Sequence, residues 1–141
     1  MNLKKEILPL LGRHIGISGG QQGWESLVSI SPLYHSKLPS GLKIGSLFAI
    51  GNLEEPLCDR LVIAKVVGFV QKSIGEITKV RVANAEILGT WFGEYLKQIN
   101  VFFPVDKYPN YLGDNWINQK VYWLTGKARK RFLKAKTYMA G

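Results

Sequence analysis

Residues 61–89, LVIAKVVGFVQKSIGEITKVRVANAEILG, decide the fold of this chain, because they predict two long strands joined by a short loop. The first strand, 61–70, is rich in β-branched side chains, which suit a pleated surface better than a helix. Both of its alternating phases are apolar except at Lys65, so we expect this strand to be central in the sheet or covered on both faces. Gly68 predicts a bulge or a tight bend, of the kind that curls a sheet into a barrel.

The second strand, 77–88, alternates strictly until residues 83–84, where its apolar phase moves by one residue. A bulge produces such a slip. Lys79 and Arg81 fall on one phase of this strand, and we expect them to stand together on an exposed face. They are either ordinary solvated charges or a pair that contacts phosphates.

Shorter strand patterns lie on both sides of the hairpin. We expect strands over 24–31 and 42–51 before it and over 120–124 after it, joined by loops without crossover helices. Such connections favour antiparallel pairing. The expected fold class is therefore mainly β to α+β: a small curled antiparallel sheet or barrel of five to seven strands, with one or two helices and a basic C-terminal helical arm.

The best helical pattern lies at 90–100, TWFGEYLKQIN, where Thr90 can cap the first turn. Another short helix or turn is expected over 3–11, and Pro9 limits its length. Residues 12–23 contain five glycines and predict a loop. This loop is either a flexible connection or an anion-binding nest of backbone N–H groups.

Two segments of the chain resemble known barrels. LKIGSLFAI at 42–50 and RLVIAKVVGF at 60–69 resemble the start of PUA-like barrels such as the ASCH group, and equally the small β-barrel at the front of some DNA-translocating ATPases. Both resemblances imply a small barrel that works near nucleic acid. The chain departs from the ASCH pattern at Ser46, where those domains usually carry Asp, and it lacks their charged motif.

Length and composition fit one globular domain. The chain has 141 residues, of which 46% are hydrophobic, and it contains no apolar run of about 18 residues, the length that predicts a transmembrane helix. Its first residues lack the apolar stretch of a signal peptide, and its single cysteine, Cys58, allows no internal disulfide. We therefore expect a cytoplasmic protein.

The positive charge of the chain is concentrated near its C-terminal end. The net charge is +9, and residues 127–136, KARKRFLKAK, contain six of the nineteen basic residues and no acidic residue. Removing these six charges leaves +3 for the rest. Apolar residues recur there at helical spacing, so we expect a compact β-rich domain over 1–126 followed by a basic helix or tail over 127–141. The tail is solubilising, binds nucleic acid, or binds an anionic membrane surface or acidic protein.

No catalytic or metal-binding motif stands out in the sequence. GISGG at 16–20 fits the G-x-S-x-G pattern by letter, but it lacks the strand and helix that the motif needs around it. The two histidines, His14 and His35, and the single cysteine do not have metal-ligand spacing. We therefore expect no metal and no cofactor, and the sequence favours a non-enzymatic protein.

Residues 101–124 contain seven aromatic side chains. Among them, Tyr108, Tyr111 and Trp116 either pack in the core and loops or form a surface on which bases stack.

The leading functional hypothesis is a nucleic-acid-binding module, for RNA or DNA, in which a small barrel carries the basic arm. The alternative is an interaction or assembly subunit of a larger complex, which docks through segment 101–124. The residues expected to contact phosphates are Lys79, Arg81, Lys127, Arg129, Lys130, Arg131, Lys134 and Lys136.

Overall fold

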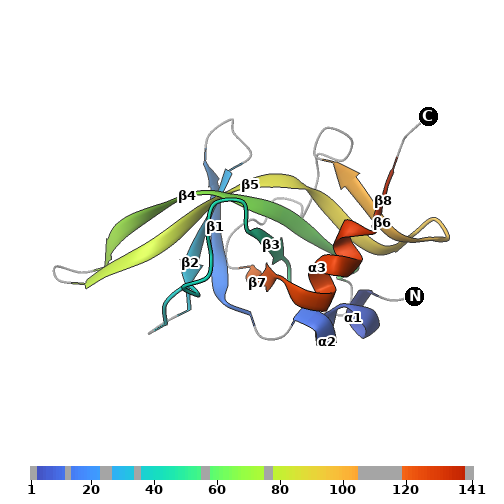
Figure 1. Ribbon diagram of the computed structural model, residues 1–141, viewed down its shortest axis with the longest axis horizontal. Helices are drawn as coiled ribbons and strands as arrows, with labels where there is room; N and C mark the ends of the chain where they lie inside the picture. Colours follow the sequence, from blue (N-terminus) through green and yellow to red (C-terminus); the bar gives the residue numbers. More distant parts are fainter. Residues whose placement is uncertain are drawn as a thin grey trace.

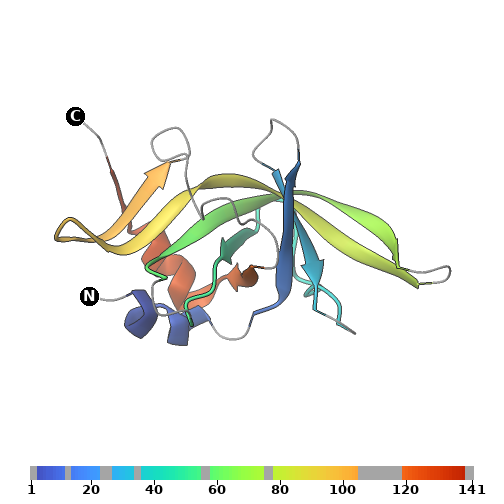
Figure 2. The same cartoon turned by 180° about the vertical axis from the view of Figure 1, so that it is seen from behind.

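The long hairpin predicted from the sequence is present and extends beyond both expected ends. In the computed structural model, strand β4 spans Arg60–Ile74 and strand β5 spans Thr78–Tyr95, and the two pair in antiparallel fashion over their length. They form a long hairpin that runs along the long axis of the molecule (Figures 1 and 2). The structure describes residues 3–11, 14–22, 27–33, 36–54, 58–74, 78–104 and 119–138.

The other elements are short. The strands before the hairpin are β1 (Gly16–Gln22), β2 (Leu27–Pro32) and β3 (Leu47–Ile50). The strands after it are β6 (Gln98–Pro104), β7 (Lys120–Leu124) and β8 (Lys136–Thr137). The helices are α1 (Leu3–Glu6), α2 (Leu8–Leu11) and α3 (Gly126–Leu133).

Six strands close into an antiparallel barrel in the order β2, β1, β7, β3, β4 and β5. The barrel closes because β5 also pairs with β2, from Leu27↔Glu86 to Ile30↔Ala83. Beyond the barrel, β6 continues the sheet from β5, and β8 pairs with β6 in parallel. The predicted fold class, a small curled antiparallel barrel with short helices, is therefore confirmed.

Two irregularities bend the hairpin. The register shifts once between Val66 and Gly68, where Val67 is the extra residue, and once between Ile63 and Ala64, where the extra residue is Leu88 of β5. A bulge predicted beside Gly68 is thus present. Bulges bend a strand and increase its twist, which is what closure of a small barrel requires.

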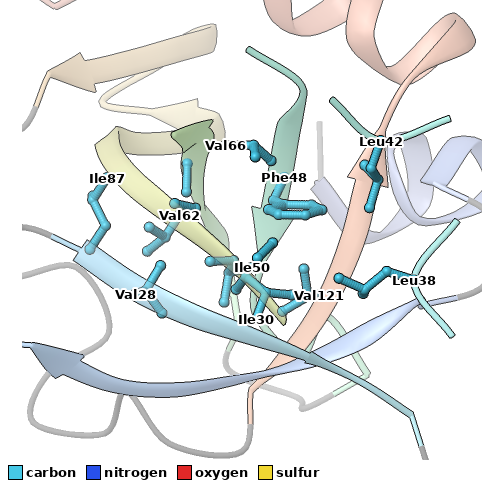
Figure 3. Packing of buried hydrophobic residues seen from close by; sticks show 13 residues of the cluster. Val28, Ile30, Leu38, Leu42, Phe48, Ile50, Val62, Val66, Ile87 and Val121 are labelled. Atoms are coloured by element: carbon cyan, nitrogen blue, oxygen red, sulfur yellow. The ribbon is translucent and has the colours of Figure 1, made fainter. Parts of the chain in front are cut away.

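The interior of the barrel is filled by alternate residues of its strands. In β3, for example, Phe48 and Ile50 point inward, and both are fully buried. Leu38 and Leu42, from the connection between β2 and β3, join the same cluster beside β7 (Figure 3). The cluster is Val28, Ile30, Leu38, Leu42, Phe48, Ile50, Val62, Ala64, Val66, Ala83, Ala85, Ile87 and Val121.

The opposite phase of three strands forms a second core on the outside of the barrel. Ala49 of β3, Ile63 of β4 and Leu124 of β7 belong to it, together with Ile7, which lies between α1 and α2, and Ala128 of α3. Figure 1 shows the three helices gathered on this side of the molecule. The prediction that the first hairpin strand is covered on both faces is therefore confirmed for residues 61–66, whereas Val67 and Val70 further along the strand are exposed.

The helix predicted over 90–100 is wrong. These residues form the end of β5, a two-residue turn at Leu96 and Lys97, and the start of β6. The turn residues have φ angles of 48° and 67°, which fits the turn type whose twist matches a β-hairpin. Trp91 and Phe92 pack in different clusters on opposite faces, so the apolar spacing that suggests a helix belongs to a sheet covered on both sides.

The glycine-rich loop predicted over 12–23 is also wrong in part, because Gly16–Gln22 form β1. A Cβ atom on Gly16 would lie 2.5 Å from the backbone oxygen of Ser31 in β2, so a side chain would not fit between β1 and β2. Glycine marks a close approach of backbones here and not a loop. The strand β7 and the helical turns over 3–11 agree with the sequence predictions.

We expect Gly89→Ala to destabilise the fold strongly. An added Cβ would collide with the carbonyl oxygen of Phe103 and the ring of Phe102 on the neighbouring strand, so the free energy of unfolding should fall by about 2–3 kcal/mol. Gly68→Ala is the matched control, since nothing lies within 4 Å of its added Cβ. Urea unfolding measures both, and equal losses for the two variants would contradict this account.

Candidate nucleic-acid interface

The basic residues predicted to contact phosphates fall into two groups. Lys79 and Arg81 lie on β5 near the free end of the hairpin, and the other six lie in α3 and the residues that follow it. Figures 1 and 2 place this end of the hairpin and α3 on opposite sides of β1 and β2 along the long axis. The two groups therefore form separate surfaces and do not merge into one patch.

Helix α3 is held against the body by two of its apolar residues. Ala128 is fully buried in the outer core. The ring of Phe132, one turn later, meets Trp91 and Phe102 edge to face, with ring centroids 5.4 and 5.2 Å apart. Residues four apart lie on one side of a helix, so this side faces the barrel and the opposite side faces solvent.

Asn100 joins the helix to the sheet through both ends of its amide. Its Oδ1 accepts a hydrogen bond of 2.7 Å from the indole N–H of Trp91, and its Nδ2 donates one of 2.8 Å to the carbonyl of Arg131. Its φ of 55° is left-handed, a conformation that asparagine tolerates better than most residues. The contact links β5, β6 and α3.

Arg131 differs from the other basic residues of the helix because it is engaged within the protein. Its guanidinium donates a hydrogen bond of 2.5 Å to the carboxylate of Glu6 in α1, and both side chains are largely covered. This ion pair connects the two ends of the described chain. Of the six C-terminal residues predicted to contact phosphates, Arg131 is therefore the one committed to packing.

The residues after α3 also pack against the sheet. Strand β8 pairs with β6 at Val101↔Lys136 and Phe102↔Thr137. The ring of Tyr138 stacks on Phe103, with ring centroids 4.5 Å apart. The helical spacing of the apolar side chains in this segment therefore reflects docking on the sheet.

The solvent side of α3 is basic. The exposed residues Lys127, Lys130 and Lys134 follow one another at helical spacing, opposite Ala128. No acidic residue occurs between positions 127 and 138. Among the described residues from 127 to 138, the exposed cations, which we call the basic face, are Lys127, Arg129, Lys130, Lys134 and Lys136.

The second group lies on the hairpin as predicted. Lys79 and Arg81 are both exposed and occupy the same face of β5, opposite Ser73 and Gln71 of β4. The guanidinium of Arg81 lies 3.7 Å from the centroid of the Phe69 ring, a cation–π contact. The expectation of a shared exposed face is confirmed.

The hairpin also carries a basic residue that the sequence interpretation missed. Lys72 is exposed on β4, opposite Val80. The sequence predicts a loop over 71–76, but β4 continues to Ile74, so Lys72 belongs to a strand. The alternation of 77–82 is the signal that could have placed Lys72 on a strand. Residues 77–82 form one arm of a hairpin, so the residues that pair with them on the other arm must also be a strand.

The predicted stacking residues Tyr108, Tyr111 and Trp116 lie outside the described residues. Their neighbours in the aromatic segment belong to the interior, because Phe103 and Tyr122 are almost fully buried. These two aromatic side chains serve the core and not an exposed platform.

An ion pair between Lys120 and Glu54 joins the start of β7 to the segment that follows β3. The ammonium of Lys120 donates a hydrogen bond of 2.6 Å to the carboxylate of Glu54, and this hydrogen bond, followed by the lysine charge, lowers the pKa of Glu54. Burial raises the pKa of the neighbouring Tyr122 phenol.

Within the described ranges, His, Cys, Asp and Glu form no group of three or more that could hold a metal ion. Of the helices in those ranges, none is long and apolar enough to cross a bilayer.

We expect Phe132→Ala to lower the free energy of unfolding by about 2 kcal/mol, because it removes the ring that α3 inserts between Trp91 and Phe102. Leu133→Ala is the control: the adjacent side chain is 59% exposed, and its loss should cost less than about 0.5 kcal/mol. Chemical denaturation of both variants checks this difference. A small effect of Phe132→Ala would mean that the helix is not docked in solution.

The Glu54–Lys120 contact predicts a pH dependence. The folded pKa of Glu54 lies below its ordinary value of 4.5, so its stabilising contribution is present above about pH 4.5 and is lost as the pH falls through the folded value. The unfolding midpoints of the wild type and Glu54→Gln should therefore differ at neutral pH and converge at low pH. Lys120→Met should remove the same difference. A gap that persists in strong acid would contradict this assignment.

Comparison with known proteins gives no family for this chain. No protein-family model matches it, and no curated protein matches it. The chemistry and position of its own residues are therefore the basis for proposing a function.

Proposed function

We propose that this protein binds nucleic acid through the basic face of α3, without carrying out a reaction. One observation carries the proposal: five exposed cations lie on and directly after a helix that is docked on the barrel. Lysine and arginine side chains presented together neutralise successive phosphates, and the counterions released from the nucleic acid favour binding.

The docking of the helix supports this proposal. A basic tail without structure must be ordered when it binds, and this ordering lowers the affinity. Here Ala128, Phe132 and the Asn100 amide hold the helix before any ligand arrives. Only the side chains of Lys127, Lys130 and their neighbours have to be ordered.

The proposed contact is with the phosphate backbone. Lysine side chains act as mobile point charges, and contacts of this kind set affinity and orientation but carry no information about base sequence. The basic face by itself therefore does not distinguish DNA from RNA. We propose binding of moderate affinity that depends strongly on salt.

The alternative hypothesis is that the protein is an interaction or assembly subunit of a larger complex. It needs the aromatic segment 101–124 to be available to a partner, and the described residues Phe103 and Tyr122 are buried in the protein's own core. The charge of α3 also fits an acidic protein, so the binding experiment must compare oligonucleotides with an acidic polypeptide.

We expect the affinity for a labelled DNA duplex to fall steeply between about 50 and 200 mM salt, because each neutralised phosphate contributes about 0.9 to the logarithmic salt slope. Replacing Lys127 and Lys130 by Gln should reduce the magnitude of this slope by about 1.8. Fluorescence anisotropy at several salt concentrations measures both quantities.

The matched control removes the same charge elsewhere. Lys37 and Lys43 are exposed on the connection between β2 and β3, and replacing both by Gln should leave the salt slope unchanged. The proposal is wrong if the wild type binds no oligonucleotide at low salt, if the two double variants behave alike, or if poly-glutamate competes as well as DNA.

A further inference from the structure

The free end of the β4–β5 hairpin extends past the barrel as a two-stranded ribbon, which we define as residues 67–74 and 78–82. Pairing of β3 with β4 ends at Lys65, and pairing of β2 with β5 ends at Ala83. In the described parts of the chain, no further strand pairs with either edge of the ribbon. It projects at one end of the long axis, away from α3 (Figures 1 and 2).

The two faces of the ribbon differ in chemistry. One face carries the cross-strand pairs Gln71↔Arg81 and Ser73↔Lys79, and all four side chains are exposed and have hydrogen-bond donor groups. The other face carries Val70↔Val82 and Lys72↔Val80. The described residues of the ribbon include three cations and no carboxylate, and the connecting residues 75–77, with Glu76, lie outside the described part.

Arg81 is held in place before any ligand binds. Its guanidinium lies over the ring of Phe69 at 3.7 Å from the centroid, and Phe69 in turn packs against the interior core of the barrel. A stacked guanidinium keeps the N–H groups at its edge available for hydrogen bonds. The ribbon therefore presents one arginine held against an aromatic ring, beside three exposed polar side chains.

These features match the groove of a DNA duplex. The major groove of B-DNA is about 12 Å wide and admits a two-stranded β-ribbon, whose strands are about 5 Å apart. Arginine and lysine bind the guanine edge there, glutamine binds the adenine edge, and serine binds either. The major groove of an RNA duplex is too narrow and deep for such an element.

We propose that the polar face of the ribbon enters the major groove of duplex DNA and contacts base edges through Gln71, Ser73, Lys79 and Arg81. The inference rests on the proposed function and names its ligand class. The basic face of α3 supplies phosphate contacts, which are independent of sequence, and the ribbon supplies a preference for DNA duplex over other nucleic acids.

The open edges of the ribbon also fit a second copy of this chain or an extended peptide. The charges on the ribbon oppose self-pairing, because lysine and arginine on two adjoining ribbons would repel each other. Charge complementarity favours the polyanion, and self-association becomes an outcome of the test.

The experiment compares two duplexes that differ only in the major groove. One contains cytosine, and the other contains glucosylated 5-hydroxymethylcytosine, whose sugar fills the major groove and leaves the phosphates in place. We expect the wild type to bind the blocked duplex at least about tenfold more weakly, which corresponds to the discrimination of a single good base contact. Lys79→Gln with Arg81→Gln should abolish this preference.

Lys72→Gln is the matched control, because it removes a charge from the opposite face of the same ribbon. It should weaken binding to both duplexes by a similar small factor and retain the preference for the open groove. Thermal unfolding should be alike for these exposed-site variants, which separates a loss of contact from a loss of fold.

Each result decides between the two proposals. Equal binding of the wild type to both duplexes, or to an RNA duplex of the same sequence, would overturn the groove contact and leave the α3 function standing. No binding to any nucleic acid at low salt would overturn both. A change in sedimentation of the Lys79 and Arg81 variant, with unchanged discrimination between duplexes, would assign the ribbon to self-association and also overturn the groove contact.

Discussion

The backbone pairing between β2 and β5 is the constraint on which the rest of this structure depends. It turns six strands into a closed barrel, so that Ile30, Ala83 and their neighbours are buried inside and not exposed at two open edges. Closure needs a strand that pairs with β4 along one edge and still offers its other edge to β2. At 18 residues, β5 is long enough to do so, and the extra residues Val67 and Leu88 supply the change of direction.

The same strand explains why the C-terminal segment is part of the folded body. Past the barrel, β5 pairs with β6 and carries Trp91 to the outer face, where Phe132 of α3 covers it. The indole N–H of Trp91 needs a hydrogen-bond acceptor there, and Asn100 provides it while binding the helix carbonyl at Arg131. Burial of an aromatic ring and satisfaction of its polar atom thus place α3, and with it the basic face.

The hairpin also divides the positive charge between two surfaces with different chemistry. The basic face consists of lysines and an arginine on α3 and directly after it, which suits phosphate oxygens. The ribbon combines Arg81 with Gln71 and Ser73 on a paired strand face, which suits the edges of bases. A long hairpin that is anchored in the middle by the barrel carries one surface at its free end and supports the other through Trp91.

Alternation and β-branched content are local properties, and they predict the hairpin, the barrel class, the closing strand β7 and the exposed pair Lys79 and Arg81. These properties do not determine the secondary structure of residues 90–100, because apolar residues three to four apart fit a helix as well as a sheet that is covered on both faces. Three features become visible in the folded molecule: Gly16 belongs to a strand, Arg131 pairs with Glu6, and Phe132 docks on Trp91. Each of these depends on a partner that is distant in the chain, and no local pattern specifies such a partner.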